Sequence, residues 1–386
     1  MNRYLIYLNN YHIRQCEAQY LSVMYEILGK NLPSHFIFPK EYLKKYKIGE
    51  RWEVRWVENH WGKYAQVMSR LKPNDFTIME KPEEFMDASV PSKLLQEVVN
   101  NPYIPEVVST IEEVLQIRGR TIKAGITWVN NRCLKETLAK FNISTIHHEL
   151  GPLRPATYIP TAYLDFSGVN GNTEFDERFA EFLKITDQVP ILNRKELIRI
   201  VSPTHYHKLC RVLDNKERKY EIGVGLQVEV DTNLLLFNNG CAWVDPLLAA
   251  KADSVGKVFV RPHPMASYIM KPDARIEIDD LKGSAIDFID KCGKIYCLNS
   301  SVGFEAILLG REAKIFGDSP FKNICSMDEE TQLKALNFAI FGYLIHRDLM
   351  FTDSYYEFRL AHRGDEKAIY LDNMQRLLKN AKGIKF

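Results

Sequence analysis

The sequence predicts an α/β protein with two doubly wound, Rossmann-like domains that face each other across a cleft. Its 386 residues exceed one domain of usual size and fit two. Apolar runs of strand length alternate with helical patterns in both halves, which is typical of mostly parallel sheets. The expected domains are residues 1–215, residues 216–350 and a helical tail, 351–386, that packs back on the first domain.

The first half begins with an apolar run of strand length at residues 4–8 and a helical pattern over 15–28 that stops before Gly29. The segment 151–172 is rich in Pro, Gly and Asn, so we expect an irregular loop there. The other expected elements are a strand over 121–129, a helix over 132–141, a strand over 143–147, and helices over 177–185 and 194–201.

The second half has the clearest doubly wound pattern. Ligands of open α/β sheets lie beyond the carboxyl ends of the strands, so the polar residues that end these strands are the candidates for function. The expected elements are strands over 222–230, 257–261, 294–298 and 313–316, and helices over 242–252, 285–291, 302–309 and, in the tail, 366–382.

Composition excludes several classes of protein. The 51 basic and 49 acidic side chains give a net charge of +2, without the basic excess of a duplex nucleic-acid binder. The seven scattered cysteines form no C-x-x-C pair, which indicates reduced thiols in a cytoplasmic protein. We see no secretion signal and no apolar run near the ~20 residues of a membrane helix. The basic and apolar tail leaves peripheral contact with the inner face of the inner membrane open.

The strongest candidate site follows the strand expected at 294–298. Asn299, Ser300 and Ser301 stand at the start of a helix, where free backbone amides and the helix dipole favour an anion. Gly303 in the first turn is expected to let a ligand approach the backbone, and Glu305 to accept hydrogen bonds from ribose hydroxyls. The alternative is an ordinary helix cap by serine.

A second candidate ends the strand expected at 257–261. Arg261 is followed by Pro262, His263 and Pro264, and the two prolines fix the backbone around the histidine. A histidine held there can stabilise or protonate a departing phosphate. The alternative is a loop histidine without a task.

A third candidate is the alternating series Gln227, Glu229 and Asp231, which shares one face if the strand continues through it. Polar side chains on a buried strand need partners, whereas an edge strand facing solvent would explain them without function. We expect no metal, because no histidine or further carboxylate follows at ligand spacing.

In the first half, Glu149 ends a strand just before Gly151 and can serve as acid or base if a cleft partly buries it. The neighbouring His147 and His148 indicate zinc only weakly, since adjacent strand residues point opposite ways. The loop that follows carries polar residues that could bind a sugar or simply form turns: Asp165, Gly168, Asn170 and Asn172.

Four segments in this order resemble the retaining β-Kdo transferases of bacterial capsule and lipopolysaccharide assembly, which have a GT-B-like fold. Each segment alone is a weak or moderate signal, but all four fall at expected strand ends. They are Glu149-Leu150-Gly151-Pro152-Leu153-Arg154, Gln227 to Asp231, Pro262-His263-Pro264, and Ser300-Ser301-Val302-Gly303-Phe304-Glu305-Ala306 through Gly310.

The resemblance implies a donor, CMP-β-Kdo, and a role for each segment. Asp231 would be the nucleophile, Glu149 the general base for the acceptor hydroxyl, and His263 the partner of the leaving phosphate. Ser300 and Ser301 would bind phosphate and Glu305 the ribose. The other expected donor contacts are Arg261, Asn299 and Gly303, and the expected supporting or sugar contacts are Gln227, Glu229, Arg154 and Asn170. No metal or other cofactor is implied.

Two other functions remain open. One is a different nucleotide-sugar transferase or epimerase of GT-B type, in which the nucleotide site would persist and Asp231 would be incidental. The other is a non-catalytic module that binds polysaccharide. A saccharide or glycolipid acceptor is the expected second partner, and no nucleic acid is expected.

Overall fold

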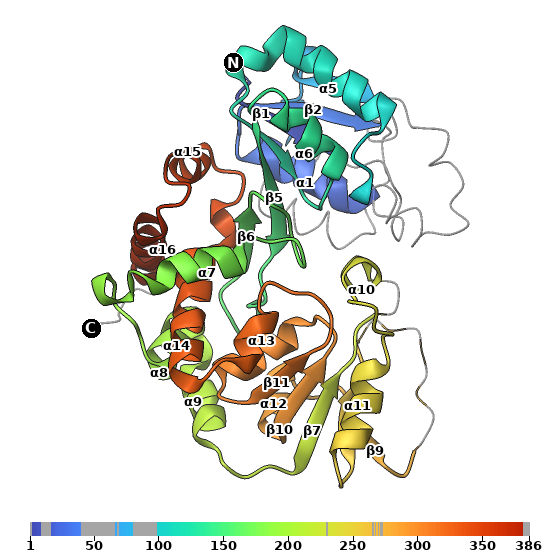
Figure 1. Ribbon diagram of the computed structural model, residues 1–386, viewed down its shortest axis with the longest axis vertical. Helices are drawn as coiled ribbons and strands as arrows, with labels where there is room; N and C mark the ends of the chain where they lie inside the picture. Colours follow the sequence, from blue (N-terminus) through green and yellow to red (C-terminus); the bar gives the residue numbers. More distant parts are fainter. Residues whose placement is uncertain are drawn as a thin grey trace. The chain divides into compact units, whose positions relative to one another are not determined.

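The computed structural model describes residues 2–8, 17–39, 66–67, 69–79, 99–228, 231–264, 266, 268, 270 and 273–380 (Figure 1). Over these residues the chain forms two sheets of mostly parallel strands flanked by helices. The predicted α/β class with two doubly wound domains is confirmed. That the domains face each other across a cleft stays a prediction.

The first sheet has the strand order β12-β6-β5-β4-β1-β2-β3. From β1 the chain moves outward to β2 and β3 and then returns to β4 on the other side of β1, as in dinucleotide-binding folds. Only β12 is shown to run antiparallel, against β6. The bounds are β1 Tyr4–Tyr7, β2 Ser34–Pro39, β3 Phe76–Met79, β4 Ala124–Thr127, β5 Ser144–Leu150, β6 Thr161–Asp165 and β12 Leu344–His346, with helices α1 Glu17–Gly29, α5 Pro105–Arg118 and α6 Arg132–Ala139.

The second sheet repeats this plan in the order β11-β10-β7-β8-β9, with all four strand pairs parallel. The strand order reverses between β7 and β10, and this reversal is where doubly wound sheets bind ligands. The bounds are β7 Tyr220–Gly225, β8 Val258–Arg261, β9 Ile276–Ile278, β10 Cys292–Cys297 and β11 Glu312–Ile315, with helices α10 Thr232–Leu236, α11 Asp245–Asp253, α12 Ala285–Asp290 and α13 Ser301–Leu308.

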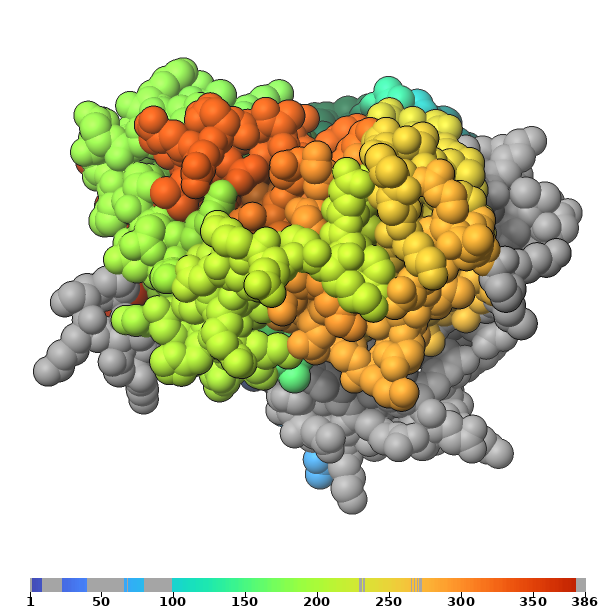
Figure 2. Space-filling view, turned by 90° about the horizontal axis from the view of Figure 1, so that it is seen from below, coloured from blue at the N-terminus to red at the C-terminus, as the bar shows by residue number. Residues whose placement is uncertain are grey.

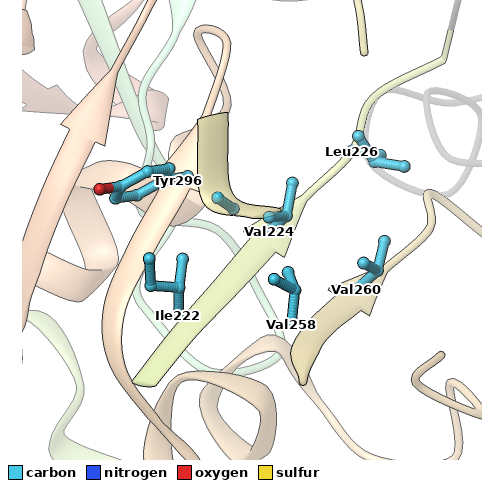
Figure 3. Close-up of a cluster of buried hydrophobic side chains, with 7 residues drawn as sticks. Ile222, Val224, Leu226, Val258, Val260 and Tyr296 are labelled. Atoms are coloured by element: carbon cyan, nitrogen blue, oxygen red, sulfur yellow. The ribbon is translucent and has the colours of Figure 1, made fainter. Parts of the chain in front are cut away.

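The core on one face of this second sheet follows from the two-residue period of its strands. Ile222 and Val224 of β7 lie beside Val258 and Val260 of β8, and each is at most 1% exposed (Figure 3). Tyr296 of β10 and Leu226 complete the cluster. This packing fixes the strands whose ends carry the candidate residues.

The remaining helices pack on one another through aromatic side chains. The ring of Phe182 lies 5.0 Å from that of Tyr370, and the backbone amide of Leu192 donates to Asn337 Oδ1 at 2.8 Å. Their bounds are α7 Phe175–Leu183, α8 Arg194–Val201, α9 Tyr206–Asp214, α14 Glu329–Asn337, the π-helix η9 Phe338–Tyr343, α15 Asp353–Ala361 and α16 Glu366–Asn380. The short 3-10 turns are η3 Pro73–Asp75, η5 Gly119–Thr121, η6 Thr186–Gln188, η7 Pro203–His205, η8 Lys322–Ser326 and η10 Arg347–Leu349.

Residue contacts divide the chain into two units, and their boundaries differ from those expected at residues 215 and 350. One unit comprises residues 1–149, 164–169 and 348–360, and the other comprises 150–163, 170–347 and 361–386. Helices α7 to α9 fall in the second unit because α7 contacts α16 and η9 while α9 contacts α12. Of the tail, α15 belongs to the first unit, where Asp353 accepts from the Tyr4 hydroxyl at 2.8 Å, and α16 belongs to the second.

Two expected elements are wrong in part. The segment 151–172 contains β6, a strand whose five residues are all buried. The strand expected over 222–230 ends at Gly225, and the next three residues lie beyond it. Among the described residues, none of the helices combines the length and apolar character that crossing a membrane requires.

Candidate functional site

The candidate site lies at the carboxyl ends of β7 and β10, where the strand order reverses. Gln227 follows β7 and Asn299 follows β10. Figure 2, seen from below the view of Figure 1, shows the residues before β7 (yellow-green), around α11 (yellow) and around α12 (orange) together on one face. The sequence therefore placed these polar residues at the correct end of the sheet.

Helix α13 starts at this end, and its first turn is closed by the Gly303 amide, which donates to the Ser300 carbonyl at 3.1 Å. Ser300 caps the helix, because its hydroxyl accepts from the Val302 amide at 3.4 Å. The ordinary cap is thus present. Whether Ser300 and Ser301 also bind a phosphate stays a prediction, favoured by the positive end of the helix dipole.

Gly303 has a different task from the expected one. A Cβ atom on this residue would lie 3.0 Å from Cys297 Sγ and 3.0 Å from Ile315 Cδ1, so its open side faces the sheet. A Cβ on Gly225 would likewise come within 2.7 Å of Val302 Cγ1. Both glycines let α13 lie close against the strand ends, and the expectation that Gly303 admits a ligand is wrong.

Gln227 binds Asn299 through both ends of its side-chain amide. Gln227 Nε2 donates to Asn299 Oδ1 at 2.9 Å, and the Asn299 backbone amide donates to Gln227 Oε1 at 3.1 Å. Asn299 Nδ2 donates to the carbonyls of Asn233 at 2.9 Å and Phe237 at 3.2 Å. These two predicted site residues therefore fix the backbone around the site rather than presenting free amides to it.

Asp231 caps α10, the short helix that follows β7. Its Oδ1 accepts from the Asn233 backbone amide at 3.0 Å. The expectation that it shares one strand face with Gln227 is wrong, because β7 has already ended and the Leu226 amide donates to the Arg261 carbonyl at 3.0 Å. Glu229 lies outside the described residues.

Glu305 is a carboxyl in the second turn of α13, only 8% exposed. Burial raises its pKa to about 7, although the charge of Arg154 opposes this, as do the nearby hydroxyls of Tyr158 and Ser301 and the charge of Arg261. The segments 154–158 and 301–305 and the end of β8 therefore meet around one carboxyl. Such a group changes charge near neutral pH: ionised, it accepts hydrogen bonds from a ribose through both oxygens, and protonated, it keeps an acceptor oxygen and gains a donor.

We expect the Glu305 carboxyl to make stability fall as pH rises from about 4.5 to about 7. The folded protein binds this proton in that window and the unfolded chain does not, so the free energy of unfolding decreases by about 3 kcal/mol across it. Glu305→Gln removes this loss. Its free energy of unfolding should equal that of the wild type at pH 4 and exceed it at pH 8. Urea unfolding of both proteins across this range checks the effect. A constant difference at every pH would contradict it.

Arg261 is engaged already. Its guanidinium pairs with Asp279, which is 5% exposed, and its Nη2 donates to the Gly283 carbonyl at 3.0 Å. Arg154 Nε donates to the Gly151 carbonyl at 3.1 Å, and its side chain is otherwise exposed. Of the two predicted basic contacts for a sugar carboxylate, Arg154 is the more accessible.

His263 follows β8 in the rigid Pro-His-Pro segment, partly buried. Its backbone amide donates to the Tyr268 hydroxyl at 3.4 Å, and the Tyr268 ring packs 4.7 Å from that of Trp243. The segment is therefore fastened to the face of the second sheet. A role toward a leaving phosphate stays a prediction.

Glu149 is the sixth residue of β5, half-buried, and the strand positions it as the sequence predicted. The two preceding histidines find separate partners: His147 Nδ1 lies 3.3 Å from the Asp165 carbonyl and His148 Nε2 lies 2.7 Å from the Tyr356 hydroxyl. Burial lowers the pKa of His147 to about 3, so it is neutral. Within the described ranges, no three histidine, cysteine or acidic side chains are placed to bind a metal ion.

The residues after β6 have two roles: Asp165 forms a turn, and Asn170 contacts a residue of the site. Asp165 Oδ1 accepts from the amides of Ser167 at 2.7 Å and Gly168 at 3.1 Å, which is the turn-forming alternative. Asn170 adopts a φ of 59° and donates from Nδ2 to Asn233 Oδ1 at 2.5 Å. Asn170 thus reaches the site through Asn233, a residue that sequence reasoning missed.

Asn233 and Tyr158 are the site residues without a signal in the sequence. Asn233 sits in the first turn of a five-residue helix, and Tyr158 sits in a segment expected to be an irregular loop. Both contact the site through residues remote in the chain. No local spacing could have revealed them.

Two family models match the chain over separate segments. Residues 6–174 match the glycosyltransferase 99 family N-terminal domain, and residues 186–333 match the capsule polysaccharide biosynthesis protein family. No curated protein matches the sequence. The expected resemblance to glycosyltransferases of bacterial surface polysaccharide assembly is confirmed by these two matches.

Solved structures give weaker likenesses. The β-Kdo 2,7 and β-Kdo 2,4 transferases of KpsC from Thermosulfurimonas dismutans are each 16% identical, with TM-scores of 0.43 and 0.42. They cover 65% and 60% of this chain and 88% and 84% of their own. The UDP-GlcNAc 2-epimerase of Methanocaldococcus jannaschii is 13% identical with a TM-score of 0.29, covering 88% of this chain and 92% of its own. With TM-scores below 0.5, these likenesses carry no argument about function.

Proposed function

We propose that this chain is a retaining β-Kdo transferase. Its first part matches a glycosyltransferase 99 N-terminal domain, and its second part matches a capsule polysaccharide biosynthesis protein. Its donor is CMP-β-Kdo, and its acceptor is a saccharide or glycolipid of surface polysaccharide synthesis. The two family matches support a glycosyltransferase. The choice of Kdo rests on the four motif segments, which run from Glu149 to Gly310.

One observation carries the proposal. Asp231 caps a helix whose backbone is bound by Asn299, the residue that immediately precedes the capping Ser300 of α13. A carboxylate and a helix N-terminus suited to phosphate are therefore linked through one asparagine at the switch point of the sheet. A transferase with an enzyme nucleophile needs both groups near the donor.

The proposed reaction is a double displacement. An Asp231 carboxylate oxygen attacks the anomeric carbon while the bond from that carbon to the phosphate oxygen breaks, and CMP leaves with the electron pair. The acceptor hydroxyl then attacks the same carbon, Glu149 takes its proton, and the Asp231 carboxylate departs. Two inversions retain the configuration.

The other residues would bind and orient the donor. His263 would stabilise the charge of the leaving phosphate, Ser300 and Ser301 would bind phosphate with the α13 amides, and Glu305 would bind the ribose. Arg154 is the accessible cation for the Kdo carboxylate. Gln227, Asn299 and Arg261 would act through the backbone and partners that they hold, and no metal takes part.

The test is a donor panel read by thermal shift and by nucleotide release. We expect CMP and CMP-Kdo to raise the melting temperature, since a ligand at ~100 times its Kd adds about 2.7 kcal/mol. Only CMP-Kdo should give release of CMP, at the same rate in EDTA.

Each other outcome would contradict part of the proposal. Stabilisation by UDP-sugars but not by CMP would indicate another nucleotide-sugar transferase or an epimerase. Binding of polysaccharide without any donor turnover would indicate a non-catalytic module. Loss of turnover in EDTA, restored by a divalent cation, would overturn the metal-free mechanism.

A further inference from the structure

Asn233 lies beside the proposed nucleophile and is bound by two remote segments of the chain. We infer that Asn233 is the positioning residue of the site: it sets where the Asp231 carboxylate points. This inference rests on the proposed function, in which Asp231 is the nucleophile. Asn233 itself touches neither sugar nor phosphate in this account.

The first step is the contact between the two residues. The Asn233 backbone amide donates to Asp231 Oδ1 at 3.0 Å. One carboxylate oxygen is thereby occupied, and the other stays available for attack on the anomeric carbon. Because the bond also fixes the side-chain rotamer, the position of the Asn233 amide determines the direction of the free oxygen.

The second step is what fixes Asn233. Its side-chain Oδ1 accepts from Asn170 Nδ2 at 2.5 Å, and its carbonyl accepts from Asn299 Nδ2 at 2.9 Å. Asn170 comes from the loop after β6, and Asn299 from the end of β10. Two asparagines from remote segments therefore clamp the residue that holds Asp231.

The third step is that both asparagines are themselves anchored. The Asn170 backbone amide donates to the Tyr163 hydroxyl at 3.1 Å, and the side chain of Asn299 is bound by Gln227. Tyr163 belongs to β6, and its ring is stacked on Tyr343 at 5.2 Å. The network thus ends on Tyr163 of β6 and on Gln227, two residues beyond the end of β7.

The clamp is needed because α10 cannot fix itself. It has five residues, far fewer than the ~12–15 at which a helix becomes even marginally stable in water. Without the Asn170 bond, Asn233 would keep its cap by Asp231 and its bond to Asn299 but would lose the anchor of its side chain. A nucleophile displaced by about 1 Å costs on the order of 10²-fold in rate.

The experiment compares Asn233→Ala, Asn170→Gly and the double variant. Glycine suits position 170, where φ is positive. Asn238→Ala is the matched control, since Asn238 Oδ1 only accepts from the Gly240 amide in the turn after α10. The readouts are the rate of CMP release from CMP-Kdo with water as acceptor, the donor KM, the Kd of CMP and the melting temperature.

We expect Asn233→Ala and Asn170→Gly each to lower kcat by about 10- to 100-fold, with donor KM and CMP Kd within about threefold of wild type. The double variant should be no slower than the slower single variant, because both remove the same hydrogen bond. Asn238→Ala should turn over at the wild-type rate.

Turnover of Asn233→Ala within twofold of wild type would overturn the inference. A loss of CMP affinity as large as the loss of rate would also overturn it, since that indicates general loosening of the site. If Asn233→Ala fails to fold, Asn170→Gly tests the same bond by the same criteria. Asp231→Asn is measured beside them to separate the role of Asn233 from the proposed function. If Asp231→Asn turns over normally, Asp231 is not the nucleophile, whatever the rates of the Asn233 and Asn170 variants.

Discussion

Asp231→Asn is expected to lower the rate of CMP release from CMP-Kdo by at least about 10³-fold while CMP still binds. The substitution removes the anionic oxygen that would attack the sugar. It keeps the cap of α10, because asparagine caps helices as well as aspartate does and its Oδ1 can still accept from the Asn233 amide. Initial rates of CMP release and CMP titration by calorimetry measure the two effects.

Trapping the intermediate gives an independent measurement of the same assignment. Wild type mixed with CMP-Kdo without acceptor should carry a Kdo adduct on Asp231, found by peptide mass spectrometry, and Asp231→Asn should carry none. Asp245→Asn is a suitable control, because Asp245 also caps a turn in this unit: its Oδ2 accepts from the Ala242 amide at 2.8 Å. An adduct on another residue, or normal turnover by Asp231→Asn, would show that Asp231 is not the nucleophile.

The elements that the sequence predicted well are those with strong local signals. Helix α8 has its predicted bounds, because Asn193 forms a capping box with Glu196 and apolar residues follow at helical spacing. Strands β8, β10 and β11 are short apolar runs between turns. Strand β6 was missed, since its neighbours are Pro-rich and its five residues gain their partners from remote strands.

From the sequence, the site could be predicted only where polar residues directly follow a recognisable strand. Asn299 and Ser300 follow an apolar run and precede a helix, and Glu305 lies within that helix, so their location could be predicted. What their side chains do was not, because Asn299 meets Gln227 across 72 positions and Glu305 is buried against a segment near Tyr158. Gly303 shows the same limit: its neighbours Cys297 and Ile315 are known only once the sheet exists.

The residues that hold the site are neutral amides rather than charges. Gln227, Asn299, Asn233 and Asn170 form a continuous hydrogen-bonded series, whereas Arg261 is neutralised by Asp279. Such amides fix geometry without adding a field that would compete with a negatively charged donor. This arrangement leaves the electrostatics of the proposed donor site to the α13 N-terminus, Arg154 and the titratable Glu305.

The largest effect on stability is expected from Arg178→Met. Arg178 donates from Nε and Nη2 to the two oxygens of Glu366, both at 2.8 Å, and from Nη2 to the Gly342 carbonyl at 2.7 Å. The two side chains are only 10% and 4% exposed, so the variant leaves a buried carboxylate unpaired. The expected loss is about 3–5 kcal/mol in the free energy of unfolding, measured by urea titration.

The matched control comes from the end of the same helix. Lys184 pairs with Glu181 at 2.7 Å, but these side chains are 67% and 61% exposed, so Lys184→Met should cost less than about 1 kcal/mol. Replacing both buried partners, Arg178→Met with Glu366→Leu, should recover most of the loss, since no charge is then left without a partner. If the double variant is as unstable as Arg178→Met, the loss comes instead from the packing of the guanidinium on the Phe338 and Tyr343 rings, which lie 5.7 Å and 5.6 Å away. In that case the aromatic contacts of Arg178 with η9 stabilise α7 more than its ion pair with α16 does.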